Sequence, residues 1–201
     1  PEQIIQTAKS FIGVIQQIPP MYSAVHYQGQ RLYQLARKGI TVEVNPRQVE
    51  IYSLDITDIS SNESGLIQVY FKVKCSEGTY IRTLCHDMGQ KLATGAYMDQ
   101  LIRVNSGVFR IEESYTPETI MAIGLESCLK PLDYPINKFP AMQLNEENYN
   151  RVCNGNSIEV LKDYESEIVR LYYQDNLAAI AKCCQGDPTI LKPIKVFSGH
   201  D

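Results

Sequence analysis

The chain has 201 residues, of which 44% are hydrophobic and 21% charged, with a net charge of −4 at pH 7. This length predicts one or two domains of ordinary globular composition, and the negative charge argues against a generic nucleic-acid binder. No apolar run approaches the roughly 18–20 residues that cross a bilayer. We therefore expect no membrane partner, and the lack of a signal-peptide pattern predicts a cytoplasmic protein.

The two halves of the chain differ in charge. Residues 1–110 carry 11 Lys and Arg against 9 Asp and Glu, whereas residues 111–201 carry 8 against 14. If the protein binds RNA, we expect it to use a local surface in the first half, and the overall charge contributes nothing.

The N-terminal segment predicts a helix followed by a strand. Residues 1–11 place Ile4, Ile5 and Ala8 on one stripe. Residues 14–18 then predict a strand, which Pro19 and Pro20 end.

Residues 21–40 mix aromatic and basic side chains. The mixed set is Tyr22, His26, Tyr27, Arg31, Tyr33, Arg37 and Lys38. Aromatic rings stack on unpaired bases and cations meet phosphates, so the mixture is typical of a surface for unpaired RNA. The alternative is an amphipathic helix with a solvated charged edge. Leu32 and Leu35 predict a short helix ending at Gly39.

A predicted strand pair leads into the most informative stretch. Residues 47–56 and 66–75 read as antiparallel strands, with apolar residues alternating from 67 to 75. The period then becomes helical, with a stripe formed by Ile81, Leu84, Cys85, Met88 and Leu92. Thr79 is the predicted N-cap. Tyr80 and Arg82 therefore fall where a strand ends and a helix begins.

Arg82 is unusual in the first turn of a helix. The helix dipole disfavours a cation there by up to about 1 kcal/mol. An arginine in this place is better accommodated if it grips a carboxylate or phosphate. The alternative is an exposed arginine whose stem covers apolar neighbours.

The rest of the chain predicts a helix, a boundary and a small β domain. Residues 116–128 fit a helix with Thr116 as N-cap and Pro117 at its first position. Three prolines between residues 130 and 140 place a domain boundary near Asn137. Four short strands follow, at residues 157–160, 168–172, 177–181 and 194–197. They predict a small β-barrel.

The cysteines do not predict a metal site. The six cysteines form no CxxC pair, and we expect reduced, mostly buried thiols. Cys85, His86 and Asp87 could suggest a nucleophilic thiol, but Cys85 lies on the apolar stripe.

Two runs resemble one enzyme family. CSEGTYIRTLCHDMGQKLATGAYMDQLIR, residues 75–103, is similar to the CSxGTYIRTL…DLGxxLGxGAxxxxLRR string of the TruB family of tRNA pseudouridine-55 synthases. QQIPPMYSAVHYQGQRLYQLARKGI, residues 16–40, also resembles that family. The resemblance implies an α+β fold. Residues 1–136 would hold part of the mixed, mainly antiparallel sheet of pseudouridine synthases with flanking helices, including a thumb insertion at about 21–47. Residues 137–201 would form a PUA-like RNA-binding β-barrel.

The resemblance also implies an activity. The parent enzyme would be a monomer that isomerises uridine 55 in the T loop of tRNA without metal or organic cofactor, through attack by an aspartate. Arg82 would hold that aspartate ionised, Tyr80 would pack on the base, and Leu101 would close the apolar wall. The residues implied to grip the T stem-loop are Tyr22, His26, Arg31, Arg37 and Arg103. Ile102 stands where the family often has a second arginine, which leaves Arg103 alone.

The family's nucleophilic aspartate lies near a GTLDPxATG string, which this sequence lacks. We therefore expect the chain to correspond to the C-terminal two-thirds of such an enzyme and to be inactive alone. Asp99 is the one acid near the proposed pocket, but its surroundings lack the nucleophile motif. The alternative is a non-catalytic RNA-binding module.

Overall fold

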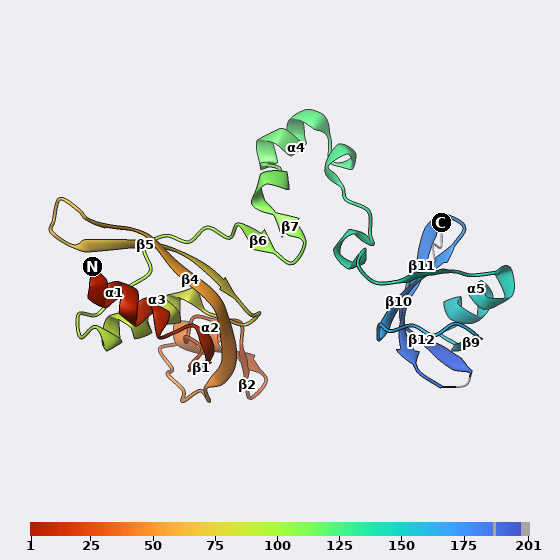
Figure 1. Cartoon of the computed structure of the whole chain (residues 1–201), viewed down its shortest axis with the longest axis horizontal. Coiled ribbons are helices and arrows are strands. Elements are labelled where there is room, and N and C mark those ends of the chain that lie inside the picture. Colours follow the sequence, from red (N-terminus) through yellow and green to blue (C-terminus); the bar gives the residue numbers. More distant parts are fainter. Residues whose placement is uncertain (187, 198–201) are drawn as a thin grey trace. The chain divides into compact units, whose positions relative to one another are not determined.

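The computed structural model describes residues 1–186 and 188–197 and contains two compact units, Pro1–Ile102 and Arg103–Asp201 (Figure 1). Residues 187 and 198–201, which belong to the predicted C-terminal domain, lie outside the description. The contacts divide the chain earlier than the predicted boundary near Asn137, because the stretch before that residue is bonded to the second unit through Asp133 and Arg170. The boundary near Asn137 stays a prediction.

The N-terminal unit has three helices and five strands among its described residues. In order they are α1 (Glu2–Lys9), β1 (Gly13–Gln17), β2 (His26–Tyr27), β3 (Gln30–Arg31), α2 (Leu32–Arg37), β4 (Arg47–Ser61), β5 (Ile67–Cys75) and α3 (Ile81–Lys91).

One antiparallel sheet organises this unit. Its strand order is β1-β4-β5, with Ile15 opposite Val49 and Leu54 opposite Val73. The expected strand pair is therefore present, and β4 runs five residues beyond the predicted end at Ile56.

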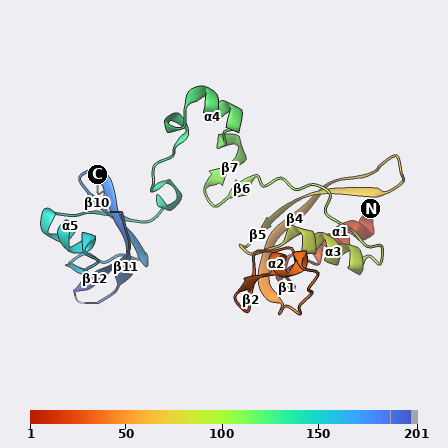
Figure 2. The ribbon, with the colours of Figure 1, turned by 180° about the vertical axis from the view of Figure 1, so that it is seen from behind.

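Helices α1 and α3 lie side by side in Figures 1 and 2 and share one core with the sheet. The buried members of that core are Ala8, Ile51, Leu54, Leu84 and Met88. The helical stripe predicted from Ile81 to Leu92 is confirmed, since its central residues Leu84 and Met88 are buried. Burying a leucine or methionine side chain contributes about 1.5–3 kcal/mol, so this core fixes α3 on the sheet.

The C-terminal unit begins with small elements and ends with a curled sheet. In order they are β6 (Asn105–Ser106), β7 (Phe109–Arg110), a 3-10 helix (Ile111–Glu113), α4 (Pro117–Ile123), 3-10 helices (Glu126–Cys128 and Tyr134–Ile136), β8 (Ala141–Gln143), α5 (Glu146–Cys153), β9 (Ile158–Val160), β10 (Ile168–Tyr173), β11 (Asn176–Cys184) and β12 (Thr189–Val196).

Helix α4 begins as predicted and ends early. The Thr116 hydroxyl accepts a hydrogen bond from the Thr119 N–H at 3.2 Å, and Pro117 is the first helical residue. The helix stops at Ile123 because Gly124 turns the backbone to φ +86°, which breaks the helical path. Only a separate 3-10 turn covers the end of the predicted range.

Five strands form the curled sheet, in the order β8-β10-β11-β12-β9, with α5 beside it (Figures 1 and 2). The sheet is a half-barrel around a core that includes Val152, Val169, Leu171 and Leu191. Strands β9, β10 and β11 match three of the predicted strands, whereas the fourth prediction, residues 194–197, covers only the end of β12. Strand β8 and helix α5 were not predicted, because β8 is only three residues long and α5 is rich in Asn and Glu. No described helix has the length and apolar character to span a membrane.

Candidate active site

The corner, residues 76–82, connects β5 to α3. Ser76 closes its start, because its N–H donates to the Glu50 carbonyl at 2.8 Å and its Oγ accepts from the Glu50 N–H at 2.9 Å. Gly78 turns the chain at φ +78°, and the Thr79 hydroxyl donates to the Ser76 carbonyl at 2.9 Å. The predicted N-cap was wrong by one residue: Tyr80 is the N-cap, because the Thr79 hydroxyl is used to close the turn.

Tyr80 is held through its backbone by a residue that the sequence analysis did not single out. The Gln17 side chain, only 2% exposed, accepts from the Tyr80 N–H at 2.7 Å and donates to the Tyr80 carbonyl at 3.1 Å. The Tyr80 carbonyl also accepts the first helical bond, from the Leu84 N–H at 3.0 Å. The last residue of β1 thus fixes the start of α3.

Arg82 is exposed in the first turn of α3. That turn contains no acidic residue, and within residues 1–186 and 188–197 the Arg82 guanidinium has neither an ion pair nor a hydrogen bond. The local electrostatics are those of an anion site, since a cation and the free N–H groups of a helix N-terminus occur together.

Strands β2 and β3 form a tight hairpin that joins two of the predicted RNA-binding residues. His26 lies directly opposite Arg31, and both are exposed. The two turn residues, Gln28 and Gly29, have φ values of +47° and +81°, as a type I′ turn requires. Two basic groups at opposite positions on one face suit a shared anion.

Helix α2 anchors the hairpin. Leu32 is completely buried and Leu35 nearly so, while the Leu32 N–H donates to the Val25 carbonyl at 2.8 Å. The Arg37 guanidinium lies 5.4 Å from the centre of the Tyr33 ring. Tyr22, at 62% exposed, precedes these elements. The segment therefore combines apolar anchors with exposed basic and aromatic groups. It has features of both interpretations, the surface for unpaired RNA and the amphipathic helix with a charged edge.

Leu101 and Arg103 lie in an irregular stretch. Leu101 is 53% exposed and is the next-to-last residue of the N-terminal unit, whereas Arg103 is the first residue of the C-terminal one. Their assigned roles in the uridine pocket and on the RNA backbone stay predictions.

The stretch after α3 is anchored at Gly89. A Cβ built on Gly89 would lie 2.2 Å from the Ala96 nitrogen, and the Gly89 carbonyl accepts N–H groups from Thr94 and Gly95, each at 3.1 Å. Only glycine permits this approach of the returning chain to the helix.

The thiol constellation considered in the sequence has no support. Burial raises the pKa of the Cys85 thiol, which disfavours the nucleophilic thiolate. Burial also raises the pKa of the Asp87 carboxyl. Among the described residues no three His, Cys, Asp or Glu side chains are grouped to hold a metal ion.

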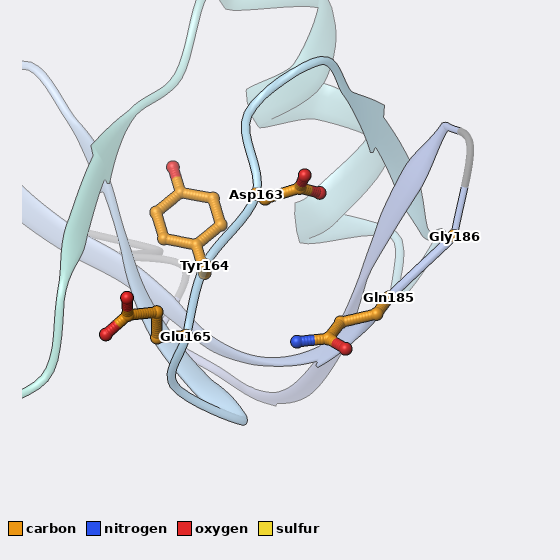
Figure 3. Close-up of a pocket in the computed structure, with 5 residues that line it drawn as sticks. All are labelled: Asp163, Tyr164, Glu165, Gln185 and Gly186. Carbon is orange, nitrogen blue, oxygen red and sulfur yellow. The ribbon is translucent and has the colours of Figure 1, made fainter.

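A shallow hollow of about 460 Å³ in the C-terminal unit is a poor alternative site (Figure 3). Its lining residues are Asp163, Tyr164, Glu165, Gln185 and Gly186. Asp163 accepts a hydrogen bond from the Thr189 hydroxyl at 2.6 Å, and burial raises the pKa of Tyr164. Two carboxylates without a lining cation do not suit a phosphate ligand, and none of the predicted site residues lies here.

Two of the overlooked residues had a sequence signal. Gln17 falls on the same face of β1 as Ile15, so a polar residue occupies an inward position just before two prolines. Gly89 is a lone glycine within a helical pattern, which often marks a close approach. Ser23 had no such signal; its buried hydroxyl has no partner in the described part of the chain.

Comparison with known proteins adds a family match over the first 137 residues. Residues 1–81 match the family described as TruB family pseudouridylate synthase (N terminal domain). Residues 82–137 match the tRNA pseudouridylate synthase B C-terminal domain.

Curated relatives extend the match along nearly the whole chain. The tRNA pseudouridine synthase B of Syntrophomonas wolfei is 43% identical over 98% of this chain and 67% of its own length. Those of Clostridium kluyveri and Clostridium tetani are 38% and 37% identical, over 87% and 90% of this chain. The chain spans 60% and 62% of these two relatives.

Two solved structures share the fold. A Cbf5-Nop10-Gar1 complex matches 98% of this chain and 61% of its own, with a TM-score of 0.68 and 23% identity. An H/ACA RNP bound to a substrate RNA containing 2'-deoxyuridine matches 100% and 62%, with a TM-score of 0.69 and 21% identity. These similarities describe the fold of the chain.

Proposed function

Because this chain belongs to the TruB family of pseudouridylate synthases, we propose that it is part of an enzyme that converts uridine in tRNA to pseudouridine. It would supply the corner at residues 76–82, called the arginine corner for Arg82, and the RNA-gripping segment at residues 21–47. The family resemblance expected from the two sequence motifs is confirmed. The target nucleotide, uridine 55 of the T loop, is part of the proposal, as are a monomeric state and a cytoplasmic location.

The proposed reaction needs a nucleophile that this sequence does not carry in the family's motif. The uridine first leaves the base stack, because its glycosidic bond cannot be reached inside it. An aspartate from a segment outside the 201 residues would attack C1′ of the sugar and displace the base as the N1–C1′ bond breaks. The base turns, and its C5 attacks C1′ and expels the aspartate. C5 loses a proton and N1 gains one, so the product is an isomer and no oxidant or organic cofactor is needed.

Each predicted site residue has a role in this proposal. Arg82 would pair with the aspartate through two N–H groups and keep it ionised. Tyr80 would pack on the base, and Leu101 would exclude water from it. His26, Arg31, Arg37 and Tyr22 would hold the T-loop backbone and bases, with Arg103 on a phosphate.

The observation that carries the proposal is the state of Arg82. It is an exposed arginine without an anion in the described structure, at a helix start without an acid, two residues after a backbone-locked tyrosine. An arginine that only covers apolar neighbours would also be exposed, but here the first turn holds no acid that offsets the unfavourable helix dipole. A carboxylate brought by the nucleophile segment would complete this site.

The test uses the longest natural protein that contains this chain and a tRNA transcript. We expect pseudouridine at position 55, mapped by chemical modification, and none in a transcript with cytidine at that position. Pseudouridine at another position would overturn the T-loop assignment, and its absence from every transcript would overturn the enzymatic proposal.

A non-catalytic RNA-binding module is the second candidate, because the exposed basic and aromatic groups at Tyr22, His26 and Arg31 could bind RNA without any chemistry. It predicts salt-dependent binding of a T-arm RNA without any isomerisation. Turnover by the longest natural protein would exclude it.

A further inference from the structure

The buried Gln17 carboxamide does more than fill space in the core, because it holds the backbone of Tyr80. An amide buried without hydrogen bonds would be costly, and both polar groups of this one are used on a single residue, Tyr80. The pairing has the form of a strand ladder, with one donor and one acceptor on each side. It occurs at the residue where an extended backbone, φ −100° and ψ 104°, changes to a helix.

Gln17 also connects the corner, residues 76–82, to the chain that leads into the RNA-gripping segment. It is the last residue of β1, and Pro19, which is buried, and Pro20 follow it and lead to Tyr22. One residue further on, the Ile18 carbonyl accepts a long hydrogen bond of 3.5 Å from the Thr83 hydroxyl of α3. The start of α3 and the base of residues 21–47 are thus tied at adjacent positions.

We propose that Gln17 is a positioning residue: its carboxamide fixes the Tyr80 peptide, and so sets Tyr80 and Arg82 for the reaction while Pro19 and Pro20 set the RNA-gripping segment against them. The inference rests on the proposed function. A displacement of about 1 Å among catalytic groups can lower the rate roughly 100-fold, so loss of a backbone clamp at this point would have a large effect on the rate.

The first arm of the test measures amide hydrogen exchange in the 201-residue chain. Gln17→Met keeps the length of the side chain and removes both hydrogen bonds. The Tyr80 N–H then loses its partner, whereas the Leu84 N–H keeps its bond to the Tyr80 carbonyl. We expect the ratio of Tyr80 to Leu84 protection to fall by about five- to tenfold, the scale of one net hydrogen bond. An unchanged ratio would overturn the clamp.

The matched control is Val49→Ala. Val49 is 5% exposed on β4, opposite Ile15 of β1, and makes no hydrogen bond to Tyr80 through its side chain. It destabilises the same sheet without touching the clamp. We expect it to lower the protection of Tyr80 and Leu84 together, which leaves their ratio unchanged.

The second arm measures pseudouridine formation by the longest natural protein that contains this chain. We expect Gln17→Met to lower kcat by at least about tenfold with little change in KM, because RNA is still gripped while the corner is misplaced. Val49→Ala should keep kcat once the fraction folded is equal. If the wild type is active and both variants keep the same kcat, Gln17 is structural only and the inference fails. An inactive wild type would overturn the proposed function, and the catalytic part of this inference with it.

Discussion

Two arginines in this chain are used in opposite ways. Arg170, in β10 of the C-terminal unit, donates from Nη1 to Asp133 Oδ2 and to the Tyr172 hydroxyl, each at 2.9 Å, and from Nε to the Phe139 carbonyl at 2.9 Å. Arg82, in the N-terminal unit, has no such partner within the described residues. The arginine side chain thus forms several bonds in one unit and, among the described residues, none in the other.

The different partners of the two arginines indicate which of them can still bind a ligand. Nε and Nη1 of Arg170 donate to a carbonyl, an anion and a phenol, and the side chain is only 14% exposed, so it holds the segment before β8 to the half-barrel. Arg82 lies where the helix dipole disfavours a cation, and within residues 1–186 and 188–197 it has no anion that offsets this. We therefore propose that Arg170 serves stability and Arg82 ligand binding, and the predictions below test that division.

The largest effect is expected at Arg82. Arg82→Lys keeps the charge but cannot form two parallel hydrogen bonds to a carboxylate. In the longest natural protein we expect kcat to fall roughly 100- to 1,000-fold, the scale for losing one electrostatic contact in an active site. The unfolding temperature should stay the same, because Arg82 has no partner to lose.

Arg170→Lys is the matched control for that variant. It should reduce the stability of the C-terminal unit, through loss of the bonds to Asp133 and Phe139, and leave kcat unchanged. If the two variants exchanged these effects, the comparison of the two arginines would be wrong.

The second prediction concerns Gly89, which anchors the stretch leading to Leu101. Gly89→Ala gains helix propensity but forces its Cβ against the backbone of Gly95 and Ala96. Overpacking of this kind costs about 1–3 kcal/mol, so we expect a net loss of stability in urea unfolding. Gln90→Ala, exposed on the same helix, should be close to neutral; an equal loss in both variants would show that the close approach is unimportant.

The third prediction uses the pH dependence of the Arg170 cluster. The Tyr172 hydroxyl and Arg170 lower the pKa of Asp133, so its contribution to stability is present above the unfolded pKa of about 3.9. That contribution is lost as pH falls through the folded pKa. We expect Asp133→Asn to cost about 1–3 kcal/mol at neutral pH and progressively less below pH ~4, measured by unfolding of the C-terminal unit. If the stability difference between wild type and Asp133→Asn stayed the same in acid, the Asp133 carboxylate would not be the source of that stability.

The smallest effect is expected in the hairpin. Arg31→Gln removes one cation opposite His26, and we expect T-arm RNA affinity to fall roughly fivefold. The slope of log K against log salt should flatten by about 0.7, the value for one phosphate contact of a single strand. Gln30→Ala, at the neighbouring position of β3, should leave the slope unchanged. A slope that Arg31→Gln does not alter would place the RNA elsewhere.

The sequence predicted what depends on periodicity. The β4–β5 pair, the α3 stripe and strands β9, β10 and β11 of the half-barrel follow from alternation and helical spacing, and the family motifs led to Tyr80 and Arg82. It did not predict what depends on a single long-range bond. Gln17 meets Tyr80 across 63 positions, and the Thr79 hydroxyl was available either as a cap or to close its turn. Short elements such as β2, β3 and β8 are too brief to show a period.

The most direct test of the account is tritium release from tRNA labelled at C5 of uridine. The 201-residue chain is assayed alone and with a separately made segment that carries the family's GTLDPxATG motif. We predict release only in the mixture, and its loss when Arg82 is replaced by lysine, because the arginine corner needs a nucleophile brought to it. Release by the chain alone, abolished by Asp99→Asn, would show that the nucleophile lies within these residues and would contradict the account.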